Sequence, residues 1–193
     1  MTIYKSIRGY ITNKNRDDRF EPNIKKSTNW KHWVSKLTES TCLRCLELHG
    51  KIYSTAEIPI PTPPLHIFCK CKIQPLGSVV AGEATNDGLN GADWWLMNYG
   101  TLPSYYLSEA EYRALGWKPS NSPSAYAPGM MLTRGIYRNW NKHLPDAPGR
   151  IWYEADLNYY TGKRNKHRMI WSNDGLLFVT YDHYTSFIEV IGG

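Results

Sequence analysis

The chain has 193 residues, of which 41% are hydrophobic and 13% aromatic, and its formal net charge is +6 at pH 7. This length allows one comfortable domain or two small ones, and no apolar run reaches the about 20 residues that cross a bilayer, so we expect no membrane partner. Residues 1–79 hold 13 Lys and Arg against 6 Asp and Glu, whereas residues 80–193 hold 10 against 11. The basic excess therefore lies in the front of the chain, where it helps to gather a polyanion or serves solubility or a protein contact.

The chain begins with polar and charged residues, and residues 1–26 predict an irregular or extended lead-in without a signal peptide. Beyond them, apolar residues recur at helical spacing, at Trp30, Trp33, Val34 and Leu37. This pattern predicts a short helix with one buried face, and Ser27 or Thr28 is placed to cap its start.

All four cysteines of the chain follow in one segment, as a C-x2-C pair and a C-x-C pair, at Cys42, Cys45, Cys69 and Cys71. Two thiolates from one tight turn and two more across the loop suit a tetrahedral structural metal, zinc above all, with His66 as a substitute ligand. Disulfides between the two pairs, or free thiols, are the alternatives. The proline-rich stretch IPIPTPP between the pairs predicts an extended arm.

Residues 77–90, GSVVAGEATNDGLN, are rich in glycine and small polar residues and predict a linker. The expected domains are therefore a cysteine-rich module over 1–76 and a second domain over 91–193. In the second domain we expect a helix over 92–98 that ends at Gly100.

A capping box, Ser108 with Glu111, predicts a second helix that ends at Gly116, and a short third helix is expected over 121–126. Strands are expected near 132–137, 151–157, 167–172, 175–180 and 186–190. The run Asn173-Asp174-Gly175 predicts a hairpin between the third and fourth of them. The fold class is thus α+β, with helices first and an antiparallel sheet after them.

Four residues of the sheet region combine a carboxylate, two guanidiniums and an imidazole: Glu154, Arg164, Arg168 and His183. Internal cleavage of a phosphodiester needs a base, an acid and fixed cations for the charge that builds on the phosphate oxygens. Strand alternation places Glu154 on the same face as Trp152 and Asp156. Such residues also occur as solvated strand surface, so their types alone do not prove a site.

From residue 91 to 191 the chain resembles barnase and related microbial ribonucleases, in GADWWLMNYGTLPSYYLSEAEYRALGW, YAPGM, NKHLPDAPGRIWYEADLNY, TGKRNKHR, WSNDGLL and YDHYTSF. The resemblance implies an endoribonuclease that needs no cofactor and cleaves RNA by 2′-hydroxyl attack through a 2′,3′-cyclic phosphate. It implies Glu154 as the general base and His183 as the general acid. By the same resemblance Arg164 and Arg168 hold the phosphate.

The resemblance also implies supporting roles near the phosphate. Asp156 would pair with the two arginines from behind, and Tyr184 would line the phosphate site. In the base-recognition loop, Tyr137 and Asn139 match the family pattern. Trp140 and Asn141 stand where the family has an arginine and a glutamate. Trp140 offers stacking that tolerates any base, and Asn141 accepts a hydrogen bond more weakly than a glutamate does, so the base preference is open.

One further departure concerns the second helix. A gap-free alignment places Glu109 where the family has a lysine near the phosphate. A carboxylate there would repel the substrate, which would reduce activity or abolish it, and Arg113 one turn later could replace the lost cation.

The cysteine segment, TCLRCLELHGKIY with PPLHIFCKC, resembles the C-terminal part of phage head-morphogenesis proteins of the MuF type, which implies a docking or delivery module. Together the two resemblances predict a toxin-type effector that is made in a bacterial cytoplasm and then delivered to other cells or packaged. Its partners would be RNA, a barstar-like immunity protein and delivery or phage-head machinery. The alternative is a catalytically weakened binding or structural protein.

Overall fold

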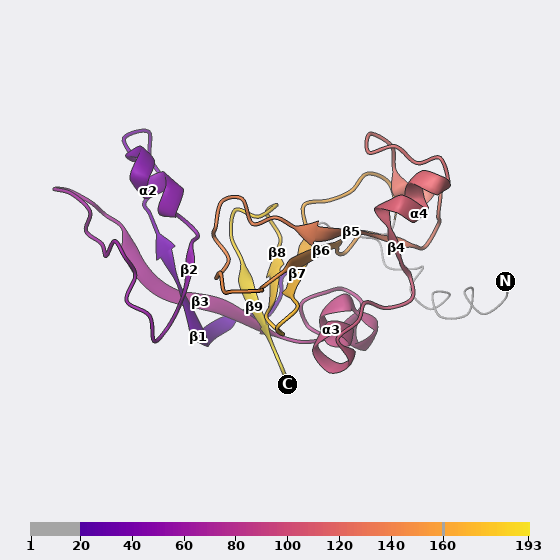
Figure 1. Cartoon of the computed structure of the whole chain (residues 1–193), viewed down its shortest axis with the longest axis horizontal. Coiled ribbons are helices and arrows are strands. Elements are labelled where there is room, and N and C mark those ends of the chain that lie inside the picture. The colour runs from indigo at the N-terminus through magenta and orange to yellow at the C-terminus, as the bar shows by residue number, and fades with distance from the viewer. Residues whose placement is uncertain (1–19, 160) are drawn as a thin grey trace.

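The structure is a computed structural model that describes residues 20–159 and 161–193, and it has a mixed α and β architecture (Figure 1). The helices within these ranges are α2 (Leu43–Leu48), α3 (Ala92–Tyr99) and α4 (Glu109–Ala114), with single 3-10 turns η1 (Gly88–Asn90) and η2 (Pro123–Ala125). No helix in the described ranges is long and apolar enough to cross a bilayer.

The described strands form one nine-stranded sheet in the order β2-β1-β3-β9-β8-β7-β6-β5-β4. They are β1 (Lys25–Val34), β2 (Ile52–Ser54), β3 (Lys72–Val80), β4 (Tyr106–Ser108), β5 (Met131–Tyr137), β6 (Trp152–Asp156), β7 (Arg168–Ser172), β8 (Leu177–Thr180) and β9 (Ile188–Ile191). Neighbours are antiparallel except for the pairs β3–β9 and β4–β5, which are parallel.

Local sequence signals correctly predict two helices and five strands of the second half, but they miss strand β4 and the parallel pairs β4–β5 and β3–β9 of a sheet expected to be antiparallel. Helix α3 ends at Gly100, whose φ of 69° is the left-handed conformation that glycine adopts without strain. Helix α4 starts at the expected capping box, in which the Ser108 hydroxyl accepts from the Glu111 amide. Strands β5 to β9 lie where the alternation predicts them, whereas the expected third helix is only the 3-10 turn η2.

The helix predicted around residues 30–37 is wrong, because these residues belong largely to strand β1. Strand β1 pairs with β2 on one side and with β3 on the other, so its backbone groups are satisfied across the sheet. The side chain of Trp33 is fully buried, and Trp30 packs against Phe178 with ring centroids 5.8 Å apart. Long-range pairing therefore overrides the helical spacing of the apolar residues.

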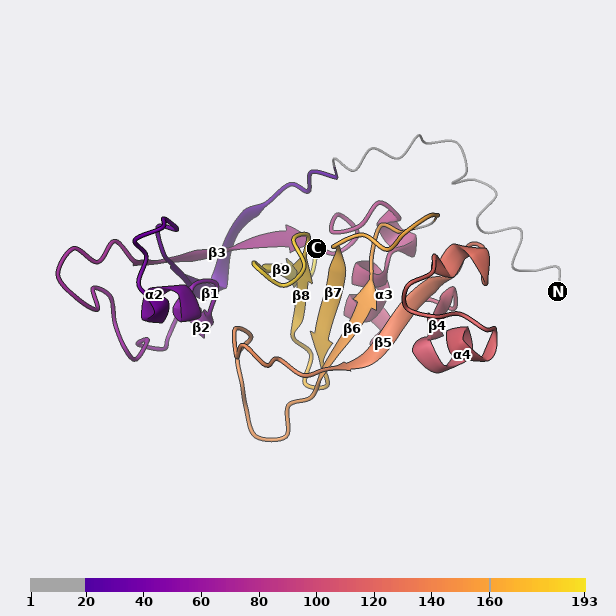
Figure 2. The same cartoon turned by 90° about the horizontal axis from the view of Figure 1, so that it is seen from above.

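The segment expected as a linker, residues 77–90, begins as strand in the structure. Strand β3 continues to Val80 and lies beside β9 (Figure 2). The two strands are parallel, with Gly77 opposite Ile188. The following loop is tied to α3 by the buried carboxylate of Asp93, which accepts hydrogen bonds from the amides of Gly82 (2.6 Å) and Ala84 (2.9 Å). Residues 77–85 thus join the sheet to α3 through specific contacts.

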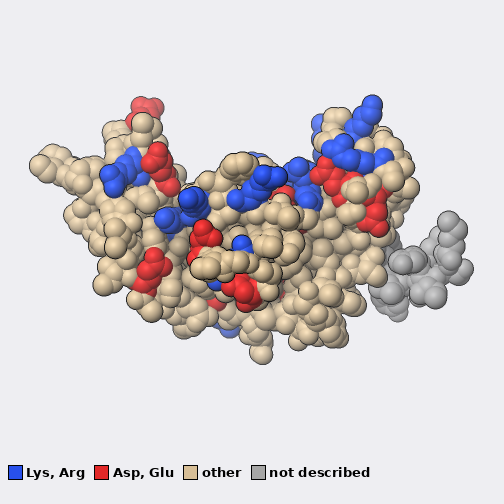
Figure 3. Space-filling model, viewed as in Figure 1, with Lys and Arg blue, Asp and Glu red and all other residues tan. Residues whose placement is uncertain are grey.

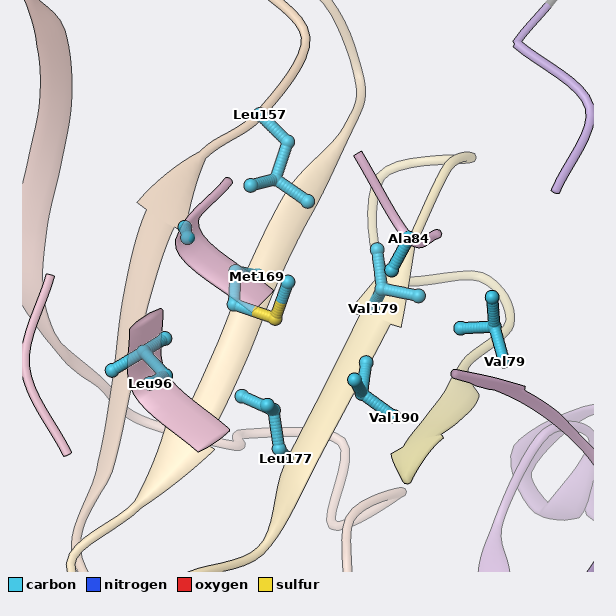
Figure 4. Close-up of a cluster of buried hydrophobic side chains, with 9 residues drawn as sticks. Val79, Ala84, Leu96, Leu157, Met169, Leu177, Val179 and Val190 are labelled. Carbon is cyan, nitrogen blue, oxygen red and sulfur yellow. The ribbon is translucent and has the colours of Figure 1, made fainter. Parts of the chain in front are cut away.

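Two hydrophobic clusters cover opposite faces of the sheet. The first lies between α3 and the strands and contains Val79, Ala84, Ala92, Leu96, Leu157, Met169, Leu177, Val179 and Val190 (Figure 4). The second contains Ile52, Leu76, Leu144, Trp152, Ile170, Phe178 and Phe187. Since Ile52 and Leu76 come from the front strands β2 and β3, both halves of the chain share this second cluster.

A buried carboxylate also joins the front strands to the rest of the sheet. Glu189 of β9 accepts hydrogen bonds from the Ser27 hydroxyl (2.5 Å) and from the Asn29 amide (2.9 Å), both on β1. A buried carboxylate left without these donors would be strongly destabilising. The contact therefore fixes β1 against the second half of the chain.

Candidate active site

Glu154 lies in the middle of β6 on the same sheet face as Trp152 and Asp156, as alternation predicts, and it is buried. The hydroxyl of Tyr184 donates a hydrogen bond to its Oε2 atom. On the neighbouring strand β5 its partner is Gly135, which has a φ of 75° and no side chain to cover the carboxylate. The carboxylate is thus held in one orientation at the surface of the sheet.

The carboxylate of Asp156 binds both Arg164 and Arg168. Arg164 donates from Nε (2.6 Å) and Nη2 (2.7 Å) to the two carboxylate oxygens of Asp156. Arg168 forms an ion pair with Asp156, with its Nε atom 3.0 Å from Asp156 Oδ1, but the Nε–H group is not aligned for a hydrogen bond. The Nη1 atom of Arg168 donates a hydrogen bond to the carbonyl oxygen of His167 (2.6 Å). One carboxylate against two guanidiniums leaves a net positive charge beside Glu154.

The ionisation of Arg164 follows from this pairing. Burial lowers the pKa of Arg164, but the hydrogen bonds and the negative charge of Asp156 outweigh burial and raise that pKa above its ordinary value. Arg164 therefore stays a cation. Because Asp156 occupies Nε and Nη2, the guanidinium has a fixed orientation, which favours bidentate binding of an anion.

His183 is positioned by a tight loop between β8 and β9. His183 and Tyr184 both have left-handed backbone conformations, with φ of 62° and 70°. Such angles are uncommon for residues with a side chain and indicate a loop whose shape is imposed by its contacts. Asp182 supplies these contacts, since its Oδ1 accepts from the amides of Thr185 (3.1 Å) and Ser186 (2.9 Å).

Although His183 is an exposed residue, loss of water on the protein side of its ring lowers its pKa, and the positive charges of Arg168 and Arg164 lower it further. The carboxylate of Glu154 acts in the opposite direction. The ring of His183 lies 4.6 Å from that of Tyr184, centroid to centroid. The structure thus gathers the carboxylate, both guanidiniums and the imidazole around Tyr184.

The end of β5 and the loop after it contain the residues expected to recognise a base. Tyr137 stacks on Tyr184 with ring centroids 5.1 Å apart, which extends the aromatic surface beside Glu154. The amide of Asn139 is used inside the loop: its nitrogen donates to the Leu144 carbonyl (3.0 Å) and its oxygen accepts from the Leu144 amide (3.1 Å). Asn139 therefore braces the loop.

The tip of this loop points into solvent. Trp140 is 82% exposed, with the guanidinium of Arg138 5.8 Å from its ring. The side-chain oxygen of Asn141 accepts a hydrogen bond from the backbone amide of His143 (3.2 Å). The side-chain nitrogen of Asn141 lies 3.0 Å from Nδ1 of the His143 ring. An exposed indole beside a cation can stack on a base of any kind.

Glu109 is paired with two arginines in the structure, which changes its expected effect on the substrate phosphate. This first residue of α4 accepts hydrogen bonds from Arg113 Nε (2.9 Å) and Arg134 Nε (3.1 Å). The hydrogen bond from Arg113 is the main cause that lowers the pKa of Glu109. Burial acts in the opposite direction, and the hydrogen bond from Arg134 lowers the pKa further. Glu109 with its two arginines carries a net charge of about +1 at neutral pH, so the expected repulsion of phosphate is offset.

Sequence reasoning missed Arg134, which lies on β5 and reaches Glu109 because β4 pairs with β5 in parallel register, with Ser108 opposite Thr133. No local motif marks this residue. Only the pairing of two strands separated by a helix brings it beside α4.

Basic side chains lie along the upper part of the face shown in Figure 3, interspersed with acidic ones. They lie above the loops of the sheet and near α4. An extended anionic chain on this face would therefore meet several cations with acidic side chains among them.

The front of the chain holds a second cluster of reactive side chains. Cys42 and Cys45 lie with His66, and Cys45 also lies with Cys69 and Cys71; within each trio the ligand atoms are no more than 4.8 Å apart. All four cysteines are free thiols. The side chains that the sequence suggests as metal ligands thus form two trios that overlap at Cys45, each compact enough to contact an ion.

Comparison with known proteins supports a catalytic reading of the second half. The family model described as ribonuclease matches residues 96–191. The chain is 38% identical over 102 residues to a ribonuclease of Heyndrickxia coagulans, which covers 52% of this chain and 94% of that protein. It is also 38% identical over 116 residues to ribonucleases of Bacillus intermedius and Bacillus pumilus, covering 60% of this chain and 72% of each relative.

Proposed function

This chain belongs to the ribonuclease family, and we propose that it is a metal-independent endoribonuclease that cleaves RNA through a 2′,3′-cyclic phosphate. Glu154 is the general base and His183 the general acid of this proposal. Arg164 and Arg168 bind the phosphate that is attacked. The observation that carries the proposal is the convergence of these four groups around Tyr184, with Asp156 orienting the arginines.

The first step follows from the chemistry of these groups. Glu154 accepts the proton of the ribose 2′-hydroxyl while the 2′-oxygen attacks phosphorus. The bond from phosphorus to the 5′-oxygen breaks, and His183 gives its proton to that oxygen. The products are a 2′,3′-cyclic phosphate and a free 5′-hydroxyl. During attack the extra negative charge on the phosphate oxygens is stabilised by Arg164 and Arg168.

The second step reverses the two roles. His183, now neutral, accepts a proton from water, which attacks the cyclic phosphate, and Glu154 returns its proton to the 2′-oxygen. The proton that Glu154 took in the first step thus returns to the substrate. The hydrogen bond from Tyr184 to Glu154 holds the carboxylate in place for both steps.

Base recognition is proposed to be tolerant. The exposed Trp140 offers a stacking surface, and Asn141 offers an amide in place of a charged acceptor. Tyr137 lines the other side of the site by its stacking on Tyr184. We therefore expect cleavage after more than one kind of base.

The biological role that we propose is that of a toxin-type effector. Support comes from the resemblance of the cysteine segment to MuF-type phage head proteins, which implies delivery or packaging machinery as a partner. The guanidiniums of Arg164 and Arg168 would accept an acidic helix of an immunity protein in place of phosphate, by analogy with the electrostatically steered pair of barnase and barstar. The excess of one positive charge around Glu109 favours this role over a weakened, binding-only protein.

Cleavage of a mixed-sequence RNA by the full chain in the presence of a chelator tests the proposal. Glu154→Gln and His183→Ala should each lower the rate by about 10²–10⁴, and the cyclic phosphate end should be seen directly. Glu57→Gln is the control, since Glu57 is an exposed carboxylate of the loop after β2. Unchanged rates in both active-site variants would show that other residues catalyse the cleavage. Expression of the wild type without a partner should be toxic, and His183→Ala should relieve that toxicity.

A further inference from the structure

We propose that Gly50 is a positioning residue of the nuclease, and that the turn around it holds both the catalytic loop (residues 182–186) and the base-recognition loop (residues 138–144). This role rests on the function proposed above. Gly50 is buried between α2 and β2, in the front of the chain and outside the family match at residues 96–191. The front of the chain would therefore take part in catalysis through the loops that it supports.

Hydrogen bonds to β1 and to α2 fix this turn in place. The Gly50 amide donates to the Trp33 carbonyl (2.9 Å), and the Trp33 amide donates to the Lys51 carbonyl (2.9 Å). The Lys51 amide donates in turn to the carbonyl of Leu48 at the end of α2 (3.1 Å). Trp33 is fully buried. Because the turn is anchored on a buried strand residue, it can serve as a fixed support for loops that pack against it.

The catalytic loop packs so closely against the backbone of Gly50 that a side chain would not fit there. A Cβ atom on Gly50 would lie 2.9 Å from the carbonyl oxygen of Thr185, whereas ordinary contacts of such an atom begin at 3.4 Å. Gly50 also has a φ of 85°, a left-handed conformation that glycine adopts without strain. Thr185 follows His183 by two residues, so the turn contacts the loop that carries the proposed general acid.

Internal hydrogen bonds make the catalytic loop one unit, so a displacement of Thr185 would also displace His183. The Thr185 hydroxyl donates to the Asp182 carbonyl (3.2 Å), and the Ser186 hydroxyl donates to Asp182 Oδ2 (2.6 Å). The His183 amide donates to the Lys166 carbonyl (3.1 Å). A catalytic group must stay within about 0.5 Å of its productive position, and the contact with Gly50 limits the movement of this loop.

The same turn holds the base-recognition loop through His143. The Ile52 amide donates to the His143 carbonyl (2.8 Å), and Nε2 of the His143 ring lies 3.4 Å from the Glu47 carbonyl oxygen. A carbonyl oxygen can only accept, so the ring proton is on Nε2, and Nδ1 accepts from the side-chain nitrogen of Asn141 (3.0 Å). A Cβ atom on Gly50 would lie 3.4 Å from this Nδ1. The amide that is proposed to meet the base is thus oriented by a histidine that the front of the chain holds.

Gly50→Ala in the full chain tests the proposal, with Gly116→Ala as the matched control. Both glycines have a φ of 85°, so both substitutions impose similar backbone strain, but a Cβ atom on Gly116 would meet Tyr126 Cε1 at an ordinary 3.9 Å. At Gly50 the Thr185 carbonyl must move by about 0.5 Å to restore an ordinary contact. We expect Gly50→Ala to lower kcat for RNA about tenfold relative to Gly116→Ala, since a misplacement of about 1 Å costs about 10²-fold. The melting temperatures of the two variants should fall by similar amounts.

The same two substitutions in a His183→Ala background show whether Gly50 acts through the acid. Without His183, Gly50→Ala should lower the rate no more than Gly116→Ala does, because residues that act as one unit are not additive. Equal kcat values for Gly50→Ala and Gly116→Ala, or the same tenfold loss with and without His183, would overturn the proposal. Failure of the proposed function is a different result, because His183→Ala alone would then leave the rate of the wild type unchanged.

His143→Phe provides a second test that decides the matter if Gly50→Ala does not stay folded at the assay temperature. Phenylalanine keeps a ring at this position but can neither donate to the Glu47 carbonyl nor accept from Asn141. We expect the distribution of cut sites among the four bases to change, because Asn141 loses the partner that orients its amide. A distribution identical to that of the wild type would show that the turn does not support base recognition and would overturn the proposal.

Discussion

Replacing Leu76 by alanine should destabilise the catalytic half of the chain, although Leu76 lies on a front strand. Its side chain is 1% exposed and belongs to the same cluster as Trp152 and Phe178, on strands β6 and β8. Removal of a fully buried leucine side chain costs about 2–5 kcal/mol, because transfer energy is lost and a cavity remains. For a chain of this length each kcal/mol lowers the melting temperature by about 2–4 °C. The expected decrease is therefore about 4–20 °C.

Two probes should be followed in the same samples: far-ultraviolet circular dichroism on heating, and RNA cleavage that survives incubation at each temperature. We expect both midpoints to fall together in Leu76→Ala. Leu43→Ala is the control, since Leu43 is 78% exposed and its loss should change stability by no more than about 0.5 kcal/mol. If the cleavage midpoint of Leu76→Ala equals that of the wild type, the front strands do not support the nuclease and the shared cluster has no energetic role.

Four other predictions concern the active site. Glu109→Lys should lower the KM for RNA and steepen the dependence of that KM on salt, because the substitution removes the carboxylate that neutralises Arg113 or Arg134. A KM that is unchanged or higher would show that these cations do not contact the substrate. The kcat/KM of the full chain should fall as pH rises through a pKa below the ordinary 6.5 of histidine, since His183 must be protonated to act as acid and burial and two arginines lower its pKa. Inorganic phosphate should raise that pKa in an NMR titration by offsetting the arginine charges, and no shift would place the phosphate elsewhere. Trp140→Ala should weaken binding by about 1–3 kcal/mol for each base that stacks on the indole, while strict cleavage after guanine in the wild type would contradict the proposed tolerance.

The second half of the fold could be predicted because its signals are local. The capping box of Ser108 and Glu111 and the turn at Gly175 each specify their geometry within a few residues. The alternation of Trp152, Glu154 and Asp156 likewise places three side chains on one face without knowledge of the neighbouring strands. These patterns hold because the partners of β6, β7 and β8 are their neighbours along the chain.

The front half could not be predicted in the same way. Strand β1 has its partners in β2 and in β3, which lie some 20 to 50 residues further on, so its extended form is decided by contacts that no short window contains. The spacing of Trp30, Trp33 and Val34 fits a helix equally well. Arg134 was missed for a related reason, because its approach to Glu109 depends on the parallel pairing of β4 with β5.

The parallel pairing of β3 with β9 has a consequence for the order in which the chain can fold. Gly77 lies opposite Ile188, so the partner of β3 leaves the ribosome more than a hundred residues later. Until then the edge of β3 that pairs with β9 stays open, and Leu76 has no Phe178 or Phe187 to pack against. Pairings of such large sequence separation form slowly, because the chain loses loop entropy before the contacts form. Since His183 precedes β9 directly, the catalytic loop and the closing strand are completed at the same late stage, and a ribosome-bound chain would remain inactive until then.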